Sequence, residues 1–520
     1  MKRLFCASLL AVALVGAAWP AAAEPGDPPA LYAEHCAACH GADRLGGMGP
    51  AMLPENLSRL RKTAARDVIA KGLPATQMPA FGETLGEDQI EALVALIYSP
   101  LPEMPHWGMA EMLASRVRHV DPATLPEAPV HNADPMNLFV VVEGGDHHVT
   151  ILDGDRFEPL VRFPSRFALH GGAKFSPDGR FTYFGSRDGW VTKYDLHSLQ
   201  LVAEIRAGIN TRNIAISGDG RFIAVANYLP HNLVLLDAAD LTPAKIIPAK
   251  SLQGKSSRVS AVYAADPRNS FVVALKDVPE MWEVSYEDKP PARFAGFGHS
   301  YEKGHEEALM VGRFPVRRIE LSGPLDDFFF DQAYRHVFGA SRDGGRAVVV
   351  HMDVGREIAE VPLPGMPHLG SGITFDYRGR RVLATPHLKE GKVSVIDMKT
   401  WKVVKVIDTL GPGFFMRSHA NSPYAWVDVF FGPNRDAVHI IDKRSLEIVK
   451  TLRPVPGKVA AHIEFTRDGR YALLSIWDMD GAVIVYDMAT LEEVKRIAFV
   501  KPVGKYNVWN KITRDEGTSH

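Results

Sequence analysis

The hydrophobic pattern of the chain changes character near residue 135. Between residues 25 and 100, apolar residues recur three and four positions apart, as in AARDVIAKG (64–72) and GEDQIEALVALIY (86–98). This spacing places apolar side chains on one face of a helix. The segment SPLPEMPHW (99–107) comes next, and proline at that density interrupts helices and strands alike. The pattern therefore predicts a small helical region followed by a linker.

From residue 135 onward, short runs of Val, Ile, Phe and Tyr alternate with turns rich in Asp, Gly, Asn and Pro. One phrase recurs, as in KFSPDGRFTYFGSRDGWVTKYDLHSLQLVAEI (174–205) and EFTRDGRYALLSIWDMDGAVIVYDMATLEEVKRI (464–497). Each copy reads as four strands, with a DGR turn between the first two. Four strands in about 40 to 50 residues is the period of a β-propeller blade. Residues 135–520 therefore predict an eight-bladed β-propeller, with about 48 residues in each blade.

The N-terminus has the pattern of a targeting segment. Lys2 and Arg3 open it, an apolar run to about Val15 follows, and AAA (21–23) ends it. This predicts a secretory signal peptide cleaved before Glu24, and a periplasmic protein. A membrane anchor is the alternative, but the run is shorter than the about 20 residues that a span needs, so we expect no membrane span. The predicted division is a signal peptide (1–23), a helical domain (24–100), a linker (101–134) and the propeller (135–520).

Charge and cysteine content narrow the function further. The formal net charge is −2, with acidic and basic residues interspersed, which is not the pattern of a nucleic-acid-binding protein. The chain has three cysteines, and Cys6 lies in the predicted signal peptide. Only Cys36 and Cys39 remain, so no disulfide framework is expected.

Residues 36–40 read CAACH, the attachment motif of a c-type haem. The thiols of Cys36 and Cys39 would hold one haem covalently, and His40 would bind the iron from one face. A dithiol redox pair or a zinc site is the alternative, although zinc would need more cysteines or well-spaced histidines nearby.

A second axial ligand is expected further along the helical domain. Met78 lies in MPAFG (78–82), just before the helical pattern that starts at Glu87, and this loop and helix look like a small class I cytochrome c. A methionine thioether on the second face suits electron transfer. Met48 and Met52 are rivals for this role.

Histidines and arginines recur at one place in the propeller repeats, just before the strand that precedes the DGR-like turn. They are His170, His368, His419, His462, Arg212 and Arg258. Equivalent positions in successive blades face the same axis, so the repeat predicts a ring of imidazoles and guanidiniums. Imidazoles ligate metals and move protons, and guanidiniums clamp carboxylates. Ordinary loop residues in phase are the alternative. The ring favours a large, flat, polyanionic ligand that contains a metal, that is, a second haem.

A cytochrome c domain joined to an eight-bladed propeller resembles the cytochrome cd1 nitrite reductase family and its relatives in haem d1 biosynthesis. The resemblance covers nearly the whole chain after the signal peptide. LHGGAKFSPDGR (169–180) resembles the segment with the proximal haem d1 ligand, TRNIAIS (211–217) and SRVSAVYA (257–264) resemble carboxylate-binding segments, and MPHLGSG (366–372) and RSHANSPY (417–424) resemble the distal-histidine loops. The implied cofactor-binding residues are His170, Arg212, Arg258, Lys276, His368 and His419.

Two further segments resemble the branch of this family that oxidises a propionate of dihydro-haem d1 to an acrylate. They are GGMGPAMLPENLSRLRK (46–62) and KPVGKYNVWNKITRDEGTSH (501–520). This resemblance implies a tetrapyrrole dehydrogenase with His368, His462 and Tyr506 in its catalytic pocket. Electrons would pass to the c-type haem and then to a periplasmic acceptor, and a transient complex with cytochrome cd1 nitrite reductase is implied. A relative that lacks a c-type haem site does not fit the CAACH motif.

Two other functions stay open on these residues. One is nitrite reduction to nitric oxide on mature haem d1, with His368 and His419 as proton donors. The other is a haem d1 carrier without turnover, for which a c-type haem has no use.

Overall fold

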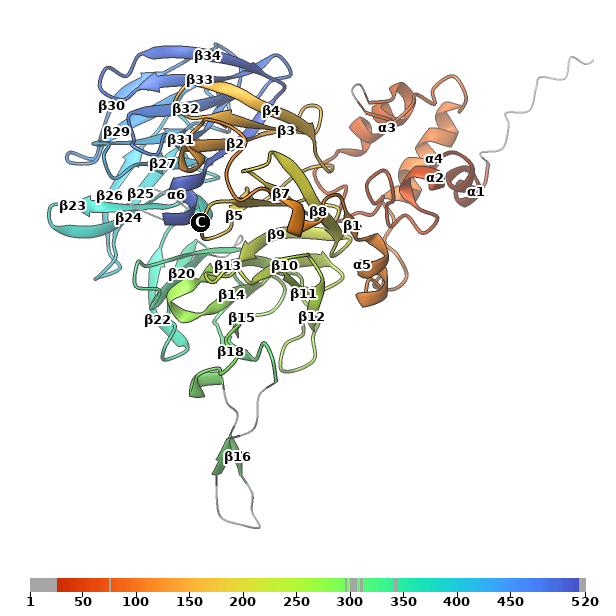
Figure 1. Ribbon diagram of the computed structural model, residues 1–520, viewed down its shortest axis with the longest axis horizontal. Helices are drawn as coiled ribbons and strands as arrows, with labels where there is room; N and C mark the ends of the chain where they lie inside the picture. Colours follow the sequence, from red (N-terminus) through yellow and green to blue (C-terminus); the bar gives the residue numbers. More distant parts are fainter. Residues whose placement is uncertain are drawn as a thin grey trace, which may run out of the picture.

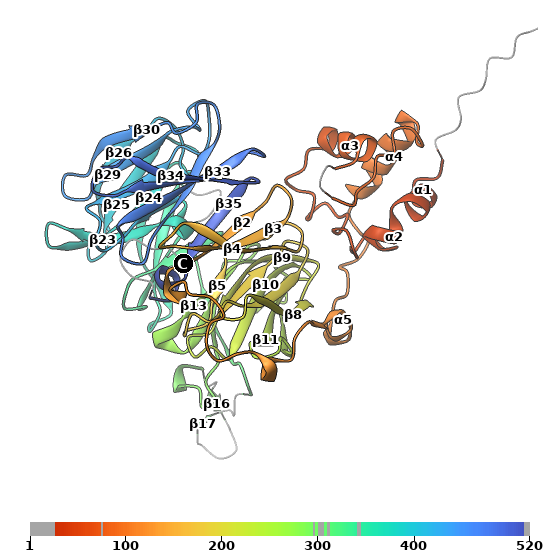
Figure 2. The same ribbon diagram turned by 45° about the horizontal axis from the view of Figure 1, so that its top comes forward.

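The computed structural model describes residues 26–73, 76–294, 297–299, 306–308, 312–340 and 345–513. The predicted signal peptide and Cys6 lie outside these residues. Figures 1 and 2 both show a group of short helices gathered at one side of a ring of β-sheets. Among the residues described, no helix combines the length and apolar character that crossing a bilayer requires.

The helical domain packs its apolar faces around one core. Its helices are α1 (Pro28–His35), α2 (Ala37–His40), α3 (Lys62–Lys71) and α4 (Glu87–Ile97). The helices α3 and α4 coincide with the two periodic segments in the sequence. Helix α4 buries Ile90, Leu93, Val94 and Ile97, which recur at the predicted three- and four-residue spacing, against α1 and α3.

The propeller consists of eight antiparallel four-stranded sheets in the described residues, so the predicted eight-bladed architecture is confirmed. The first blade contains β2 (Leu138–Glu143), β3 (His148–Asp153), β4 (Glu158–Pro164) and β35 (Pro502–Asn507). The C-terminal strand β35 pairs with β2, with Val140 opposite Tyr506. This pairing closes the ring and makes β35 the innermost strand of the first blade.

The other seven blades follow in chain order, each starting at its innermost strand. The second blade is β5 (Lys174–Phe175), β6 (Phe181–Gly185), β7 (Trp190–Asp195) and β8 (Gln200–Arg206); the third is β9 (Asn210–Ile216), β10 (Phe222–Leu229), β11 (Asn232–Asp237) and β12 (Pro243–Pro248); the fourth is β13 (Val259–Ala265), β14 (Ser270–Leu275), β15 (Glu280–Ser285) and β18 (Val316–Glu320); the fifth is β19 (Asp327–Phe330), β20 (His336–Ala340), β21 (Arg346–His351) and β22 (Arg356–Pro362).

The last three blades complete the ring. The sixth is β23 (Ile373–Tyr377), β24 (Arg380–Pro386), β25 (Lys392–Asp397) and β26 (Val403–Asp408); the seventh is β27 (Met416–Ser418), β28 (Tyr424–Asp428), β29 (Val438–Asp442) and β30 (Glu447–Leu452); the eighth is β31 (Ala460–Phe465), β32 (Tyr471–Ile476), β33 (Gly481–Asp487) and β34 (Glu493–Phe499). A small hairpin, β16 (Phe297–His299) with β17 (Glu306–Ala308), extends away from the fourth blade, and helix α6 (Val508–Thr513) follows β35 (Figure 1).

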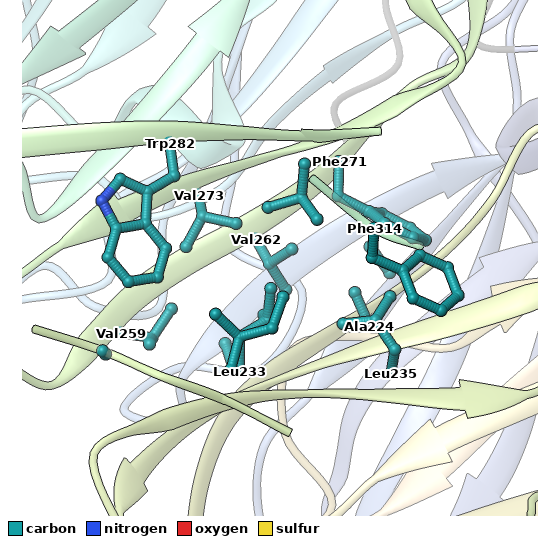
Figure 3. Close-up of a cluster of buried hydrophobic side chains, with 14 of the residues drawn as sticks. Ala224, Leu233, Leu235, Val259, Val262, Phe271, Val273, Trp282 and Phe314 are labelled. Atoms are coloured by element: carbon teal, nitrogen blue, oxygen red, sulfur yellow. The ribbon is translucent and has the colours of Figure 1, made fainter. Parts of the chain in front are cut away.

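Neighbouring blades are held together by buried apolar side chains. Between the third and fourth blades, Trp282, Phe271 and Phe314 pack against smaller residues such as Leu233 and Val262 (Figure 3). Burial of large apolar side chains contributes roughly 1.5–3 kcal/mol each, so these inter-blade cores give the ring the rigidity that a binding site needs.

The linker attaches the two domains to each other. Helix α5 (Met109–Ser115) packs against β8 and β12, and β1 (Val117–Arg118) adds a fifth strand to the second blade beside β8. The side chain of Arg206 donates a hydrogen bond to the carbonyl of Leu45 at 2.5 Å, and Asn56 donates to the carbonyl of Ile209 at 2.9 Å. These contacts fix the helical domain against the second and third blades.

Candidate functional site

A cavity of about 1210 Å³ lies between the helical domain and the propeller. From the helical domain it is lined by Cys36, Cys39, His40, Arg59 and Met78, and from the propeller by His170, Arg212, His368, His462 and Tyr506. Pockets for drug-sized ligands are typically about 300–1,000 Å³, so this one can hold something larger. The structure therefore brings most of the predicted residues of both haem sites to one continuous space.

Cys36 of the CAACH motif lies between α1 and α2, and the other four residues of the motif form α2. The thiols of Cys36 and Cys39 are both free, and burial, together with the neighbouring Cys39, raises the pKa of Cys36 to about 11. Nδ1 of His40 donates to the carbonyl of Pro50 at 2.7 Å, which leaves the lone pair on Nε2 for a metal. A Cβ on Gly49 would lie 2.7 Å from the His40 ring, so glycine permits this close packing. The arrangement fits a covalently bound haem.

The three methionines considered for the second axial position all line the cavity. Met48 is 71% exposed, whereas Met52 and Met78 both pack against the core of the helical domain. Burial therefore separates Met48 from the other two. Met78 remains our prediction for the second axial ligand.

Three cavity residues of the propeller sit on irregularities of the innermost strands. The pairing register skips Arg212 in β9, Ser260 in β13 and His462 in β31, so each is the extra residue of a β-bulge. All three line the cavity. A bulge redirects a side chain and is common beside active sites. The bulges therefore explain how these residues of the innermost strands reach the cavity.

His170 is held by two arginines. Its Nδ1 lies 2.7 Å from the carbonyl oxygen of Arg212, and Arg187 donates to its Nε2 at 2.7 Å. Burial lowers the pKa of His170 well below its usual value, and Arg212, Arg187 and Arg59 act in the same direction. The imidazole is therefore neutral, the state in which it binds a metal. Arg59 of the helical domain lines the same cavity as His170.

His368 is oriented by the loop before the seventh blade. Its Nδ1 lies 2.5 Å from the carbonyl of Phe414, and the two rings are 4.2 Å apart. Since a carbonyl only accepts, Nδ1 must carry the proton and Nε2 is left as the acceptor. Burial lowers the pKa of His368, so it too is neutral at neutral pH.

His462 of the eighth blade and Tyr506 of the first blade lie against each other. Their rings are 5.1 Å apart and nearly perpendicular. Burial lowers the pKa of His462 well below its usual value, and Lys505, Arg417 and Lys511 lower it further. Burial raises the pKa of Tyr506 to about 12. The pair therefore presents a neutral imidazole, which can accept a proton, beside a protonated phenol, which can donate a hydrogen bond.

Aromatic side chains form one wall of the cavity. The members are Phe414, Phe415, Phe430, Phe431 and Trp477. An aromatic wall beside convergent histidines and arginines fits a macrocycle with polar substituents.

Comparisons with known proteins identify the family. The Cytochrome D1 heme domain family matches residues 133–300 and 311–511. This chain belongs to the cytochrome d1 haem-domain family. Residues 23–97 match the family described as Cytochrome C oxidase, cbb3-type, subunit III, so the helical domain is a cytochrome c domain and binds covalent haem c. The predicted resemblance and both cofactor classes are thereby confirmed.

Within the cytochrome d1 family, similarity is uneven. The dihydro-heme d1 dehydrogenase of Pseudomonas aeruginosa is 57% identical over 507 residues, 98% of each chain. A solved structure described as dihydro-heme d1 dehydrogenase NirN in complex with DHE superposes with a TM-score of 0.88 at 57% identity, covering 94% of this chain and 100% of that chain. A nitrite reductase of Stutzerimonas stutzeri is 24% identical over 97% of this chain and 96% of its own length.

Three predicted residues of this cytochrome d1 domain are not among those that line the cavity in the described part of the chain: Arg258, Lys276 and His419. Arg258 forms a two-pronged ion pair with Asp277, and Lys276 pairs with Asp326, which itself lines the cavity. The predicted ring therefore contributes fewer residues to the cavity than the repeat suggests.

The position of His419 along its strand explains its placement. It precedes the strand that begins at Tyr424 by five residues, whereas His462 precedes the strand that begins at Tyr471 by nine. Because a strand rises about 3.3 Å per residue, this difference in spacing places His419 closer than His462 to the turn that follows the innermost strand of its blade. It packs beside Gly469, in the DGR turn of the eighth blade.

Sequence reasoning missed Arg417, which takes the place that His419 was expected to fill. Arg417 lines the cavity and is 3% exposed. Its Nε makes no hydrogen bond to any residue that the structure describes, and the same is true of Nε1 of Trp477. Two buried donors without partners in the wall of a cavity fit a ligand that carries acceptor groups. One signal in the sequence could have identified Arg417. It stands seven residues before the strand that begins at Tyr424, which is closer to the nine-residue spacing of His462 than the five-residue spacing of His419 is.

Proposed function

We propose that this chain is a dihydro-haem d1 dehydrogenase, which oxidises a propionate side chain of dihydro-haem d1 to an acrylate. The observation that carries the proposal is the 57% identity to the dihydro-heme d1 dehydrogenase of Pseudomonas aeruginosa over 98% of both chains. This similarity spans the cytochrome c domain, the propeller and the cavity between them. Identity to the nitrite reductase is less than half as high over a similar share of the chain.

The residues of the cavity suggest how the substrate is held. We assign His170 and His368 to the substrate iron, because each has its Nδ1 beside a backbone carbonyl and is neutral. His170 becomes available when Arg187 releases its Nε2. Arg417 is buried and Arg212 is half-buried, and both line the cavity, where their guanidiniums can hold the substrate carboxylates.

The chemistry converts a CH2–CH2 unit into a CH=CH unit, so two protons and two electrons leave the side chain. We assign His462 as the group that accepts a proton, because the imidazole is neutral and lies in the cavity wall. Tyr506 remains protonated and donates a hydrogen bond that orients the side chain being oxidised. The second proton passes to water.

Electrons leave through the cytochrome c domain, whose haem accepts one electron at a time when bound. The thiols of Cys36 and Cys39 would hold that haem, and His40 and Met78 would bind its iron. Because two electrons are released, a separate acceptor must withdraw electrons during each turnover. The signal-peptide pattern supports a periplasmic location for the protein and for this acceptor. Mature haem d1 would pass to cytochrome cd1 nitrite reductase in a transient complex.

An anaerobic single-turnover experiment tests this function. Purified protein with oxidised c-type haem is mixed with at most half an equivalent of dihydro-haem d1, so that two oxidised c-type haems are present for the two electrons of each substrate. The tetrapyrrole is extracted after incubation and weighed by mass spectrometry. Loss of two hydrogen masses, together with reduction of the c-type haem, establishes the dehydrogenase. Unchanged tetrapyrrole overturns it. Protein reconstituted with mature haem d1 is then assayed with nitrite, which distinguishes a reductase from a carrier.

A further inference from the structure

A buried carboxylate behind the cavity wall contacts the backbone of His462 and the Phe414–Phe415 segment, which in turn contacts His368. Asp428 ends β28, is fully buried and does not belong to the residues that line the cavity among those described. One carboxylate oxygen accepts hydrogen bonds from the backbone N–H groups of Phe414 at 2.7 Å and Phe415 at 3.0 Å. The other accepts from the backbone N–H of His462 at 3.3 Å.

The contact with His462 completes an irregular strand. His462 is the bulge residue of β31 and has a φ of 56°, in the left-handed region that a non-glycine residue rarely adopts. A bulge residue loses its ladder hydrogen bonds, and a buried N–H without a partner is costly. Asp428 supplies that partner. Lys505, which is also fully buried, donates to the carbonyl of His462 and to Oγ of Ser475.

Both backbone groups of His462 are therefore held by buried ionisable side chains, one acidic and one basic. A strained backbone conformation persists only where the surroundings over-determine it. Here Asp428 and Lys505 do so, and the result is that the imidazole of His462 points into the cavity beside Tyr506.

The contact with the Phe414–Phe415 segment reaches the second histidine. The Phe414 carbonyl accepts from Nδ1 of His368, and this bond fixes the tautomer of His368. The Phe415 ring packs on the His462 ring at 4.7 Å. One carboxylate thus sets the backbone that orients His368 and the backbone that orients His462.

We propose that Asp428 is a positioning residue for the dehydrogenation, holding His462 and His368 in their working orientations without touching the substrate. This inference rests on the function proposed above. Asp428→Asn is the variant to test, because an amide has one acceptor atom where the carboxylate has two, and its NH2 group would meet a backbone donor.

The matched control is Asp153→Asn. Asp153 is equally buried and accepts from two backbone N–H groups, of Asp155 at 2.8 Å and Arg156 at 3.2 Å, but it lies outside the cavity wall. We expect Asp428→Asn to lower kcat about tenfold or more, with KM changed less than about threefold. The absorption spectrum of bound dihydro-haem d1 should also shift, because His368 is displaced. Asp153→Asn should leave kcat, KM and the absorption spectrum unchanged.

A double-mutant cycle separates positioning from a general loss of structure. If Asp428 acts through His462, then Asp428→Asn should add less than about a twofold further loss of kcat in a His462→Ala background. An equal loss in both backgrounds, or a wild-type kcat and spectrum in folded Asp428→Asn, overturns the proposal. If Asp428→Asn does not fold, Lys505→Gln replaces it in the same cycle, with the same non-additivity expected. A wild-type protein that leaves the substrate unoxidised refutes the proposed function, and the spectral shift then still tests the positioning of His368.

Discussion

Nε of Arg417 lies 4.0 Å from a carboxylate oxygen of Glu464, and both side chains are buried. Neither of these two atoms makes a hydrogen bond within the described residues. A buried polar atom without a hydrogen bond is unstable relative to one that is satisfied, even where other atoms of the same side chain have partners. Arg417 lines the cavity, so a carboxylate of the substrate can supply the missing acceptor.

Arg417→Met should therefore weaken binding of dihydro-haem d1 by about 10- to 100-fold, the effect of losing a charged hydrogen bond of about 1.5–3 kcal/mol. Titration of the apo-propeller site, followed by tetrapyrrole absorbance, measures the dissociation constant. Arg258→Met is the control, since Arg258 pairs with Asp277 away from the cavity. Equal affinities in the two variants would contradict the assignment of Arg417.

Removal of the proton acceptor should abolish most turnover while the substrate still binds. A general base contributes about 10²–10⁴-fold to a rate, so His462→Gln should lower kcat by about that factor. Tyr506→Phe, which keeps the ring but removes the hydroxyl, should cost less. The control is His439→Gln, because His439 is equally buried but bonded to Thr451 in an outer part of its blade. Rapid-mixing absorbance of the c-type haem gives the rates.

The blade pattern could be predicted because its chemistry is local. Asp178, Asp219 and Asp468 each accept a hydrogen bond from the backbone N–H two residues on, and the intervening glycines are left-handed. An Asp-Gly turn between two apolar strands records this geometry directly in the sequence. These three turns, in the second, third and eighth blades, mark the repeat from which the fold could be predicted.

Which side chains reach the cavity could not be predicted in the same way. Arg212 and His462 reach the cavity because they occupy bulges, and a bulge is stabilised by partners far along the chain. For His462 one partner is Asp428, 34 residues earlier, and another is Lys505, 43 residues later. Nothing near residue 462 signals these contacts. The same limitation led the repeat to suggest His419 where the structure places Arg417.

His368 and His419 should respond differently to substitution. His368 lies in the cavity wall, whereas His419 lies against the turn of the eighth blade. We expect His368→Ala to shift the absorption spectrum of bound dihydro-haem d1 and His419→Ala to leave it unchanged. A spectral change with His419→Ala would restore the distal role that the sequence suggested.

The reduction potential of the c-type haem can identify its axial methionine. Loss of a thioether ligand lowers the reduction potential of a His/Met haem. Met78→Ala should therefore lower the potential of the c-type haem, and Met52→Ala, which removes a methionine packed in the same core, should not. Redox titration of each purified variant distinguishes them. A fall in potential only with Met52→Ala would move the ligand to that residue.

Asp428 should also make stability depend on pH in a direction opposite to that of most carboxylates. Burial raises the pKa of Asp428 to about 7, against the opposing effect of its backbone hydrogen bonds and Lys505. An unfolded aspartate has a pKa of about 3.9. Between these values the folded protein binds the extra proton, so the contribution of Asp428 to the free energy of unfolding decreases as the pH rises from about 4 to 7 and is level above that.

Asparagine at this position does not titrate, whereas His462 and His368 titrate in both proteins. The stability of Asp428→Asn relative to wild type should therefore increase between about pH 4 and pH 7, by a few kcal/mol in total. Thermal denaturation of both proteins at intervals of one pH unit measures this difference. A difference that stays constant with pH would mean that Asp428 is ionised throughout the range, and that Lys505 and the three backbone N–H groups outweigh the effect of burial.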